Sequence, residues 1–514
     1  MVVSDEILVI GAGIGGLCVA LALGPTGAHV TLLERDGPPP TGDVDEAFND
    51  WRRRGVGHLR QSHAFLARLR EIIRIDHPAL HKALLDTGVR ELSFEGMLSP
   101  MQKARYVATA EDQRFTLLTS RRTTMELVIR RYVEGLANVS IRSNVFVKSL
   151  ITEPGPSGTP VVRGLNLDVG GVETQSMAAI VVDAGGKSGA LIDQLTQAGA
   201  AISDESETAG ILYFTRHYRL NPGTNEPKRD GNPPFNGDLG YLKFGVFPGD
   251  NGCFSITICV PEIEYELRKS VVDPEQWEKM MQALPGMAVW TASGISSPTS
   301  KVFGMGDLFS HWRGLVTGGV PVVLGYFPVG DTLIRTNPLY GRGCSFAAVQ
   351  AYILRDVLAQ TTDPTARVIA YDKRLRAELH PYFKNMRDQD RSAIKRSEQI
   401  LTPDYKPRLK ARLAKRFIED AVSPAMRYDI GLLREAMRAF HMIEDPGAWL
   451  KRPKNMMRIL YYWARGRNRN AAAYPPKPGP DRAAMMQRLG LSAEADVILL
   501  AERRSSLELK QEAA

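Results

Sequence analysis

The sequence is short of the features that define several common protein classes. Its 514 residues include four cysteines, which form no CxxC pair and have no zinc-ligand spacing. Isolated thiols of this kind are typical of a reducing compartment, so we expect buried free thiols in a soluble cytoplasmic protein and no disulfide framework. Cys253 and Cys259 lie an even number of residues apart, so on a strand they would share one face. The other two are Cys18 and Cys344.

Long apolar runs and several catalytic signatures are missing as well. The apolar stretch 7–33 follows Asp5 and Glu6 and is interrupted by glycines, so we expect neither an export signal nor a transmembrane helix. The chain carries no P-loop, nucleophile elbow, metal-ligand spacing or internal repeat. These absences argue against nucleotide hydrolysis, serine-type hydrolysis and metal catalysis.

A glycine-rich turn near the N-terminus is the first motif that is present. The segment ILVIGAGIGGLCVALALGPTGAHVTLLER predicts a strand at 7–10, a helix at 17–23 and a second strand at 29–33. In the turn, Gly11 permits the tight bend, Gly13 lets backbone approach a pyrophosphate, and Gly16 lets helix and strand pack closely. The helix N-terminus offers its N–H groups to phosphates, and the acid that ends the second strand can accept from ribose hydroxyls. The sequence therefore predicts dinucleotide binding through Gly11, Ala12, Gly13, Gly15, Gly16, Glu34 and Arg35.

Two later motifs favour FAD over NAD. The run LGYFPVGD ends a buried strand, and NPLYGRG at 337–343 precedes a helix. A carboxylate after a strand can bind a ribityl hydroxyl, and a Gly-rich helix N-terminus can donate N–H groups to the flavin edge that becomes negative on reduction. FAD has both a ribityl chain and a flavin ring, so its site needs both the carboxylate and the N–H groups. We therefore add these residues to the predicted contacts: Gly330, Asp331, Pro338, Gly341 and Gly343.

With the segment DAGGKS at 183–188, these motifs resemble those of the flavoprotein monooxygenases of the para-hydroxybenzoate hydroxylase type, over about residues 1–365. The resemblance implies an α/β (α+β) fold, with a Rossmann-type FAD-binding domain, an inserted β-sheet substrate domain and a C-terminal helical region. It also implies that Asp183, Ala184 and Gly185 contribute to the cofactor site.

Within that superfamily, the chain most resembles the branch of polyether epoxidases and squalene-epoxidase-like enzymes. The resemblance lies in RGV at 54–56, RQSH at 60–63, Arg122 four residues before Glu126, and YFTRHYR at 213–219. It implies that Arg54 and Arg122 lie near the FAD ribose and pyrophosphate, and that Val147 offers backbone to the adenine. From the residues alone, both arginines are equally consistent with solvated positions.

Departures from the family pattern bear on the electron donor. His58 and Gln61 stand where the branch often has Gln and His, and Gly185 and Lys187 replace the usual Thr and Arg. The DAGGKS segment, which we call the middle motif, is associated with FAD and NAD(P)H handling in the family. It therefore stays open whether NAD(P)H reduces the flavin directly or through a reductase partner. Covalent attachment of the flavin through a histidine or Cys344 stays open too, and His63 is more simply explained as a structural histidine.

The pattern of strands and helices divides the chain. We expect the first part of the FAD-binding domain at 1–204, including some substrate-domain strands near 89–118. We expect the β-sheet substrate domain at 205–320, the return of the FAD-binding domain at 321–364, and the helical region at 365–514. Within these parts we expect helices at 64–87 and 123–136 and strands at 161–169 and 177–183. Aromatic side chains from the sheet would line the substrate pocket or fill its core: Tyr213, Tyr241, Phe244 and Phe247.

The net charge of +8 is concentrated near the C-terminus, where residues 401–470 hold 16 Lys and Arg against 7 Asp and Glu. Segments such as 428–443 and 456–463 alternate apolar and basic residues. The favoured interpretation is a helical cap on the nucleotide-binding domain, and the alternative is a peripheral contact with an anionic membrane. Nucleic acid is not expected, because aromatic residues are not interleaved at stacking intervals.

The leading hypothesis is an FAD-dependent monooxygenase that hydroxylates or epoxidises a hydrophobic small molecule, polyketide- or terpenoid-like, with O2 and electrons from NAD(P)H. The alternatives are a reductase or dehydrogenase of the geranylgeranyl-reductase type, a flavin-dependent halogenase, and a membrane-surface module in which FAD is purely structural. No catalytic side chain can be named, which fits a reaction carried out by the cofactor.

Overall fold

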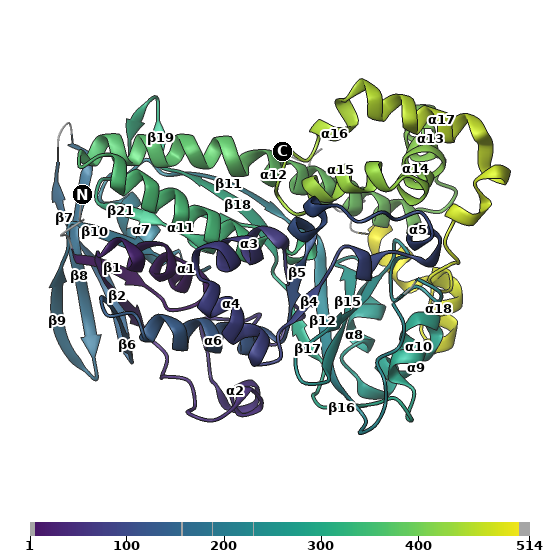
Figure 1. The fold of residues 1–514 in the computed structure, drawn as a ribbon, viewed down its shortest axis with the longest axis horizontal. Coiled ribbons are helices and arrows are strands. Elements are labelled where there is room, and N and C mark those ends of the chain that lie inside the picture. The colour runs from purple at the N-terminus through teal and green to yellow at the C-terminus, as the bar shows by residue number, and fades with distance from the viewer. Residues whose placement is uncertain (1–5, 156–157, 188, 230, 503–514) are drawn as a thin grey trace. The chain divides into compact units, whose positions relative to one another are not determined.

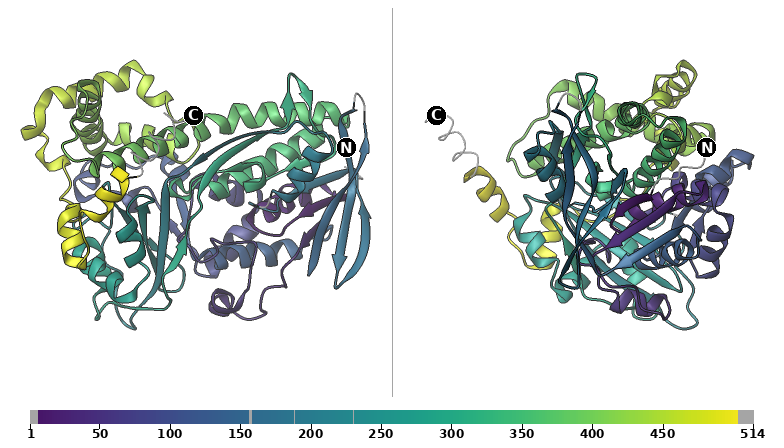
Figure 2. Two further views of the ribbon diagram at one scale, coloured as in Figure 1. Left: turned by 180° about the vertical axis from the view of Figure 1, so that it is seen from behind. Right: turned by 90° about the vertical axis from the view of Figure 1, so that its left-hand side faces the viewer.

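The computed structural model describes residues 6–155, 158–187, 189–229 and 231–502, and Figures 1 and 2 show its fold. The chain divides into two compact units. Unit 1 comprises Met1–Val89, Ser120–Thr208 and Phe309–Arg387. Unit 2 comprises Arg90–Thr119, Ala209–Leu308 and Asp388–Ala514.

Unit 1 is built around a five-stranded parallel sheet with the order β21-β10-β1-β2-β6. Short, largely apolar runs form its inner strands because both faces of the sheet are covered. The strands are β1 (Glu6–Ile10), β2 (His29–Glu34), β6 (Val139–Ser143), β10 (Ile180–Asp183) and β21 (Tyr326–Pro328). Since all five run the same way, their carboxyl ends meet at one edge of the sheet, which is where ligands bind in open α/β sheets.

One face of this sheet packs on an antiparallel meander and a helix through a shared apolar cluster that includes Leu8, Leu165 and Leu195. These elements are β7 (Val145–Pro154), β8 (Pro160–Val169), β9 (Val172–Met177) and α7 (Ala190–Gln197). The remaining helices of unit 1 include α1 and α11, which pack on each other. They are α1 (Ile14–Leu23), α2 (Val44–Asp50), α3 (Ala67–Asp76), α4 (Pro78–Asp86), α6 (Arg122–Glu134) and α11 (Gly343–Gln360), with η1 (Gly24–Thr26), η5 (Gly330–Thr332) and η6 (Pro338–Tyr340) as short turns.

A second, antiparallel sheet of unit 1 has the order β11-β18-β22. Its strands are β11 (Ser203–Thr208), β18 (Phe309–Gly314) and β22 (Ile334–Arg335). The strand β3 (Ala64–Phe65) and the hairpin β19 (Val316–Thr317) and β20 (Val320–Pro321) complete the strands of the unit. This sheet brings β18 and β22 next to the turn that follows β21.

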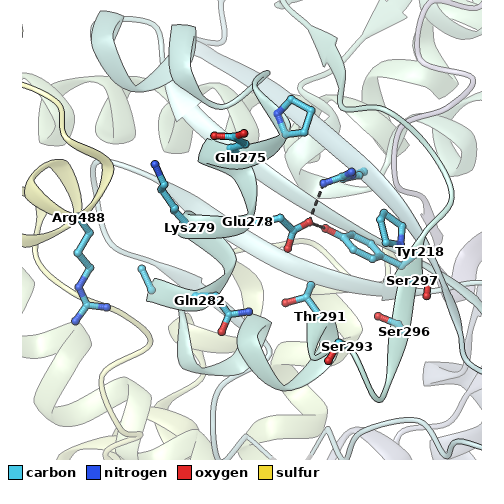
Figure 3. Close-up of a pocket in the computed structure, with 14 residues that line it drawn as sticks. Tyr218, Glu275, Glu278, Lys279, Gln282, Thr291, Ser293, Ser296, Ser297 and Arg488 are labelled. Carbon is cyan, nitrogen blue, oxygen red and sulfur yellow. Dashed lines mark hydrogen bonds and ion pairs between the residues drawn. The ribbon is translucent and has the colours of Figure 1, made fainter.

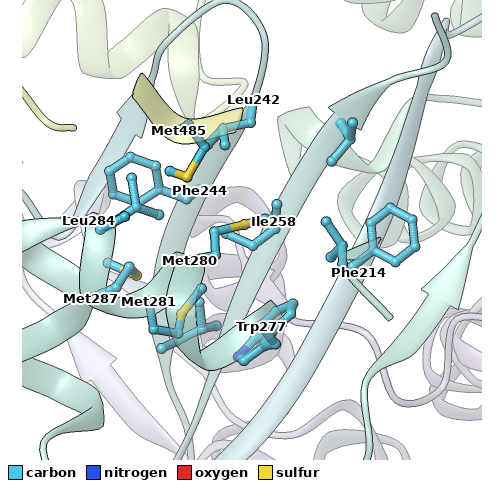
Figure 4. Packing of buried hydrophobic residues seen from close by; sticks show 14 of the residues in the cluster. Phe214, Leu242, Phe244, Ile258, Trp277, Met280, Met281, Leu284, Met287 and Met485 are labelled. Atoms are coloured by element: carbon cyan, nitrogen blue, oxygen red, sulfur yellow. The ribbon is translucent and has the colours of Figure 1, made fainter. Parts of the chain in front are cut away.

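Unit 2 contains an antiparallel sheet with the order β13-β14-β15-β12-β16, and β17 also pairs with β12. Its strands are β12 (Ile211–Leu220), β13 (Asn236–Asp238), β14 (Lys243–Pro248), β15 (Cys253–Pro261), β16 (Ser296–Pro298) and β17 (Phe303–Met305). Beside it lie α8 (Tyr265–Ser270), α9 (Pro274–Ala283) and α10 (Pro285–Thr291). One face of the sheet, with Phe244 and Ile258, packs against Trp277 and Met280 of α9 in a large apolar core (Figure 4).

The segment 90–119 and the C-terminal helices complete unit 2. The first holds β4 (Arg90–Leu92), η2 (Glu95–Met97), α5 (Pro100–Lys103), η3 (Ala110–Phe115) and β5 (Leu117–Thr119). The second holds α13 (Leu409–Phe417), η7 (Ile418–Val422), α14 (Ser423–Tyr428), α15 (Ile430–Phe440), α16 (Ala448–Lys451), α17 (Pro453–Arg469), η8 (Ala471–Ala473) and α18 (Arg482–Leu489). Ile430 of α15 packs with Phe94 and Phe115, and Met485 of α18 joins the core of the sheet.

Most of the predicted elements are present, and some need correction. The single helix expected at 64–87 is a short strand and two helices, because Pro78 disfavours helical backbone at His77 before it. The strand expected at 177–183 is divided between β9 and β10. The helical region is confirmed, but α12 (Pro364–Ile400) begins in unit 1 and residues 388–514 belong to unit 2. The helices after α12 therefore pack with the sheet unit, through Ile430 on Phe94 and Phe115 and through Met485 in the core on α9. The expected cap on the nucleotide-binding domain stays a prediction.

Among the described residues, no helix combines the length and the apolar character needed to cross a bilayer.

Candidate functional site

The glycine-rich turn between β1 and α1 has the close backbone packing that its sequence predicts. Gly11 has a φ of +90°, and its N–H donates to the Leu33 carbonyl at 2.8 Å. A Cβ at Gly11 would lie 2.7 Å from the Ala184 carbonyl oxygen, and a Cβ at Gly16 would lie 1.9 Å from the Gly11 carbonyl oxygen. Both glycines are therefore required by the fold itself.

Gly13 is different, because none of the residues that the structure describes crowds it. It precedes α1 with φ −80° and ψ −174°, and the nearest atom to a Cβ placed there would be the Arg53 Nη2 at 3.8 Å. A similar Cβ at Gly15 would meet the Ala184 Cβ at 3.5 Å, an ordinary contact. Within the described part of the chain, no side chain caps the N-terminus of α1. Open backbone at a helix N-terminus suits a phosphate group, so this turn fits the FAD pyrophosphate.

Glu34, at the end of β2, is buried and mostly engaged. Its Oε2 accepts from the Ala12 N–H and from Arg53 Nη2, both at 2.9 Å, and its Oε1 accepts from the Asp36 N–H at 3.0 Å. A carboxylate has about four acceptor positions. One position is left, which is enough for a single hydroxyl of a ribose.

Arg53 is the main residue of this region that the sequence did not reveal. Its buried guanidinium forms ion pairs with Glu34 at 2.9 Å, with Asp36 at 3.8 Å, and with Glu126. Burial opposes the charge, but the three carboxylates outweigh it and raise the arginine pKa. The predicted Arg54 and Arg35 are instead exposed. No pattern in the sequence separates Arg53 from its neighbours Arg52 and Arg54.

Basic and imidazole groups gather near Asp331. The His58 pKa is lowered well below its usual value, first by burial and then by Arg122, His63, Arg335 and Lys187. The His63 Nδ1–H donates to the Gln61 carbonyl at 2.9 Å, and its Nε2 faces Arg122 Nη1 at 3.3 Å, which fits a neutral ring that accepts from the arginine. The cluster carries positive charge around neutral histidines, and such a place favours an anion. Arg122, which the sequence predicts as a contact, is buried there and also pairs with Glu126 at 3.3 Å.

The middle motif joins the carboxyl ends of β10 and β21. The buried Asp183 carboxylate accepts from the Tyr326 hydroxyl at 2.5 Å, from the Gly185 N–H at 2.8 Å and from the Thr332 hydroxyl at 3.4 Å. Burial nevertheless raises the Asp183 pKa. This aspartate therefore holds the two strands and the turn η5 together, and it places Ala184 beside Gly11.

The GD motif follows β21. Gly330 has a φ of +70°, and its N–H donates to the Gln350 Oε1 at 2.7 Å. Asp331 is half-buried, and burial raises its pKa while Arg335 and Arg122 oppose the shift. The buried His311 donates its Nε2–H to the Asp331 carbonyl at 2.8 Å, and its own pKa is lowered to about 4 by burial first and then by Arg313.

The second glycine-rich turn leads into α11. The Asn337 side chain accepts from the Leu339 N–H at 3.0 Å, and Gly341 has a φ of +64°. Pro338 is exposed, and α11 begins at Gly343 with no side-chain cap from the residues described. Arg342 directly before it is buried with its guanidinium 5.2 Å from the Tyr382 ring, and burial lowers its pKa. Its Nε and Nη1 have no hydrogen-bond partner in the described part of the chain.

The sheet edge thus brings most of the predicted residues together, through the adjacent strands β1, β10 and β21. Val147 is placed in the meander, paired with Leu167 of β8. Burial raises the pKa of Cys344, in the first turn of α11, to about 11, so its thiol is protonated at neutral pH.

The sheet of unit 2 has a second buried face with a different character. Cys253, Ser255, Thr257 and Cys259 alternate along β15 on this face, as predicted for the two cysteines. Across the register lie Tyr213, Thr215 and His217 of β12, and the Thr215 and Thr257 hydroxyls are 2.7 Å apart. Of the four aromatics named from the sequence, Tyr241 and Phe244 belong to the apolar core. Tyr213 and Phe247 pair with Cys259 and Ser255 on the polar face.

A separate recess of about 970 Å³ opens between β12, β16, α9 and α10 of unit 2 (Figure 3). The Trp277 Nε1–H donates to the Tyr218 hydroxyl at 2.7 Å, and Arg216 pairs with Glu278 at 2.8 Å. The recess is lined by charged and hydroxyl side chains, such as Glu278, Lys279 and Thr291, together with apolar surface.

The fold can now be compared with those of known proteins. The fold of the chain is that of flavin-dependent monooxygenases and halogenases, as comparison with solved structures shows. The flavin-dependent brominase Bmp2 superposes with a TM-score of 0.58 at 17% identity, over 90% of this chain and 99% of that one. PqsL, a probable FAD-dependent monooxygenase from Pseudomonas aeruginosa, gives 0.52 at 15% identity over 77% and 99%. The anhydrotetracycline hydroxylase OxyS from Streptomyces rimosus gives 0.53 at 15% identity over 86% and 76%.

Among curated proteins, the chain is similar to Protein Rv3254 of Mycobacterium tuberculosis. The two are 28% identical over 368 residues, which cover 69% of this chain and 73% of that protein. No protein-family model matches the chain.

Proposed function

We propose that this chain is an FAD-dependent monooxygenase that transfers one oxygen atom to a hydrophobic small molecule. The single observation that carries the proposal is the open backbone at Gly13, beside an uncapped helix N-terminus and the carboxylate of Glu34. The overall reaction consumes O2, NAD(P)H and a proton. One oxygen atom enters the substrate, the other leaves as water, and NAD(P)+ is released.

The residues of unit 1 would divide the cofactor between them. The N–H groups of the first turn of α1 bind the pyrophosphate, and Glu34 accepts one ribose hydroxyl with its remaining acceptor position. Asp331 lies after the GD turn, where its carboxylate can accept from the ribityl chain. When bound, FAD supplies the redox chemistry and the activation of O2.

The N-terminus of α11 and Arg342 would serve the flavin ring. The N–H groups of an uncapped helix start carry partial positive charge. Arg342 adds a buried cation whose Nε and Nη1 lack partners within the described residues. Together they stabilise the negative charge that the pyrimidine edge of the ring gains on reduction. The positive charges of Arg122 and Arg335 would favour the negative charges of the pyrophosphate and of Asp331.

Of the two places described in unit 2, the polar face of the sheet rather than the recess beside α9 is our candidate for the substrate-binding surface. Tyr213 and Phe247 offer aromatic surface, and Cys253, Ser255 and Thr257 are small side chains on the same face. An apolar molecule with a few hydroxyl or carbonyl groups matches this mixture. A polyketide- or terpenoid-like compound fits that description, and hydroxylation or epoxidation is the proposed reaction. The polyether-epoxidase-like branch remains our proposed placement.

The first experiment is an absorbance spectrum of the purified protein, followed by anaerobic addition of NADPH and then NADH. An oxidised-flavin band that bleaches with either donor supports a self-contained monooxygenase. A band that is lost with dithionite alone points to a reductase partner. A protein that is colourless and cannot be reconstituted with FAD contradicts the proposal.

The reaction class is tested by the mass of the product from candidate substrates. A gain of one oxygen atom, taken from labelled O2, supports oxygenation. A change of two hydrogen atoms would identify a reductase or dehydrogenase, and a gained halogen would identify a halogenase, so either result contradicts the proposal.

A further inference from the structure

Helix α13 (Leu409–Phe417) has an apolar side that nothing described covers. None of its residues is buried. The side chains of Leu409 and Leu413, one turn apart on the same side, are 67% and 54% exposed, and Ile418 directly after the helix is 53% exposed. Single exposed apolar residues are common, but a row along one helix marks a contact surface.

Helix α17 (Pro453–Arg469) also carries exposed apolar side chains. Met457, Tyr461 and Trp463 are 65%, 61% and 45% exposed. The Phe417 ring of α13 contacts the Trp463 ring edge to face, with centroids 5.6 Å apart. We call the exposed apolar side chains of both helices the C-terminal apolar surface: Leu409, Leu413, Ile418, Met457, Leu460, Tyr461 and Trp463.

Basic side chains accompany this surface. Helix α13 reads LKARLAKRF, with four basic residues and no acidic one. Many arginines of the C-terminal helices are engaged, such as Arg434 with Asp112 and Arg438 with Glu111. By contrast, Lys410, Arg412 and Arg416 have no carboxylate within ion-pair distance among the residues that the structure describes. Their positive charge is therefore available to a partner.

An anionic lipid bilayer satisfies both properties. A short amphipathic helix lies in the bilayer interface with its apolar side among the acyl chains and its Lys and Arg near the headgroups. Tyr and Trp favour that interface, because an apolar ring can be buried while its polar atom stays hydrated. An acidic protein would account for the charges but not for the exposed Leu409, Leu413 and Met457, which need an apolar environment.

We propose that α13 and α17 dock this chain on an anionic lipid bilayer. The proposal does not rest on flavin chemistry, because the surface lies in residues 409–469, apart from the nucleotide-binding elements in sequence. It gives the chain access to molecules dissolved in the membrane.

The test is flotation of the full-length protein with phosphatidylcholine vesicles, with or without phosphatidylglycerol. We expect the protein to float with the anionic vesicles and to stay in the dense fraction with the neutral ones. The double variant Leu409→Glu/Leu413→Glu should lose flotation. The control Val172→Glu changes a residue that is 62% exposed on β9 and should float like the wild type. Since each basic residue near the surface contributes about fivefold, the triple variant Lys410→Gln/Arg412→Gln/Arg416→Gln should bind about a hundredfold more weakly.

Three results would overturn the proposal. The first is a wild-type protein that stays in the dense fraction with both kinds of vesicle. The second is unchanged flotation of the Leu409→Glu/Leu413→Glu variant. The third is a dimer, measured by light scattering without lipid, that the same double variant dissociates, since a second copy of the chain would then be the partner.

Discussion

Replacement of Gly13 by alanine tests whether this glycine is needed for cofactor binding rather than for folding. In the chain alone, the added methyl has space, because its nearest neighbour is the Arg53 Nη2 at 3.8 Å, and the backbone at φ −80° suits alanine. We therefore expect Gly13→Ala to fold normally. We also expect it to bind FAD weakly, because the methyl stands where the pyrophosphate approaches the helix.

The magnitudes can be worked out for both effects. Alanine reduces the entropy of the unfolded chain, which stabilises by about 0.4–1 kcal/mol. It is a poorer residue than glycine before a helix, which costs about 0.5–1 kcal/mol. The free energy of unfolding should thus change by less than about 1 kcal/mol. Loss of two charge-assisted hydrogen bonds to phosphate costs about 3 kcal/mol, or about a hundredfold in the Kd for FAD.

The assay is titration of the apoprotein with FAD, followed by flavin fluorescence, together with thermal unfolding of the apoprotein. Gly294→Ala is the matched control, because a Cβ there has space as well, with no described atom within 4 Å, and it should bind FAD normally. Gly16→Ala is the opposite control and should unfold the protein, since its Cβ would lie 1.9 Å from the Gly11 carbonyl oxygen. A Gly13→Ala variant that binds FAD as tightly as the wild type would refute the reasoning.

Three further predictions concern buried and partly buried charges. Arg53→Met leaves Glu34 and Glu126 buried without their cation. It should therefore lower the free energy of unfolding, measured by urea titration, by about 3–5 kcal/mol. The control Arg54→Met, at an exposed residue, should change this free energy by less than about 0.5 kcal/mol. Arg482→Met should destabilise unit 2 by a similar 3–5 kcal/mol or so, because Arg482 pairs with Glu264 and Asp496, whose side chains are 0% and 1% exposed; an unchanged calorimetric unfolding temperature would contradict this. The hydrogen bond from Arg438 is the main reason that the Glu111 pKa is lowered in the fold, so the pair stabilises above the unfolded pKa of about 4.3 and stops doing so as the pH falls through the lower folded value. The unfolding temperatures of the wild type and Arg438→Met should therefore differ at pH 6–8 and converge once the pH has fallen below the lowered folded pKa of Glu111, and a constant difference would contradict this assignment.

Local patterns made much of the fold predictable. The alternation that places Cys253 and Cys259 on one face is a property of any strand, and the turn from Gly11 to Gly16 fixes β1, α1 and β2 through steric requirements alone. The acid that ends β2 follows from the same unit. Each of these inferences needs no knowledge of distant contacts.

Contacts between distant segments set the rest, and there the sequence was weaker. Arg53, not Arg54, is buried among carboxylates because the chain after α2 turns Arg53 toward Glu34 and Glu126 from two other elements. The C-terminal helices pack with the sheet unit because their apolar side chains meet Phe94 and Phe115, far away in the sequence. His311 reaches the Asp331 carbonyl through the pairing of β18 with β22, which no local pattern indicates.

The two faces of the unit 2 sheet differ in what substitution would do to them. Changes at Phe244 or Ile258 disturb the packing on α9 and therefore the stability of the whole unit. Changes at Tyr213, Ser255 or Phe247 act on the opposite face and leave that packing in place. Related proteins could thus diverge in the molecules they accept by altering one side of β12, β14 and β15, while the other side keeps the unit folded.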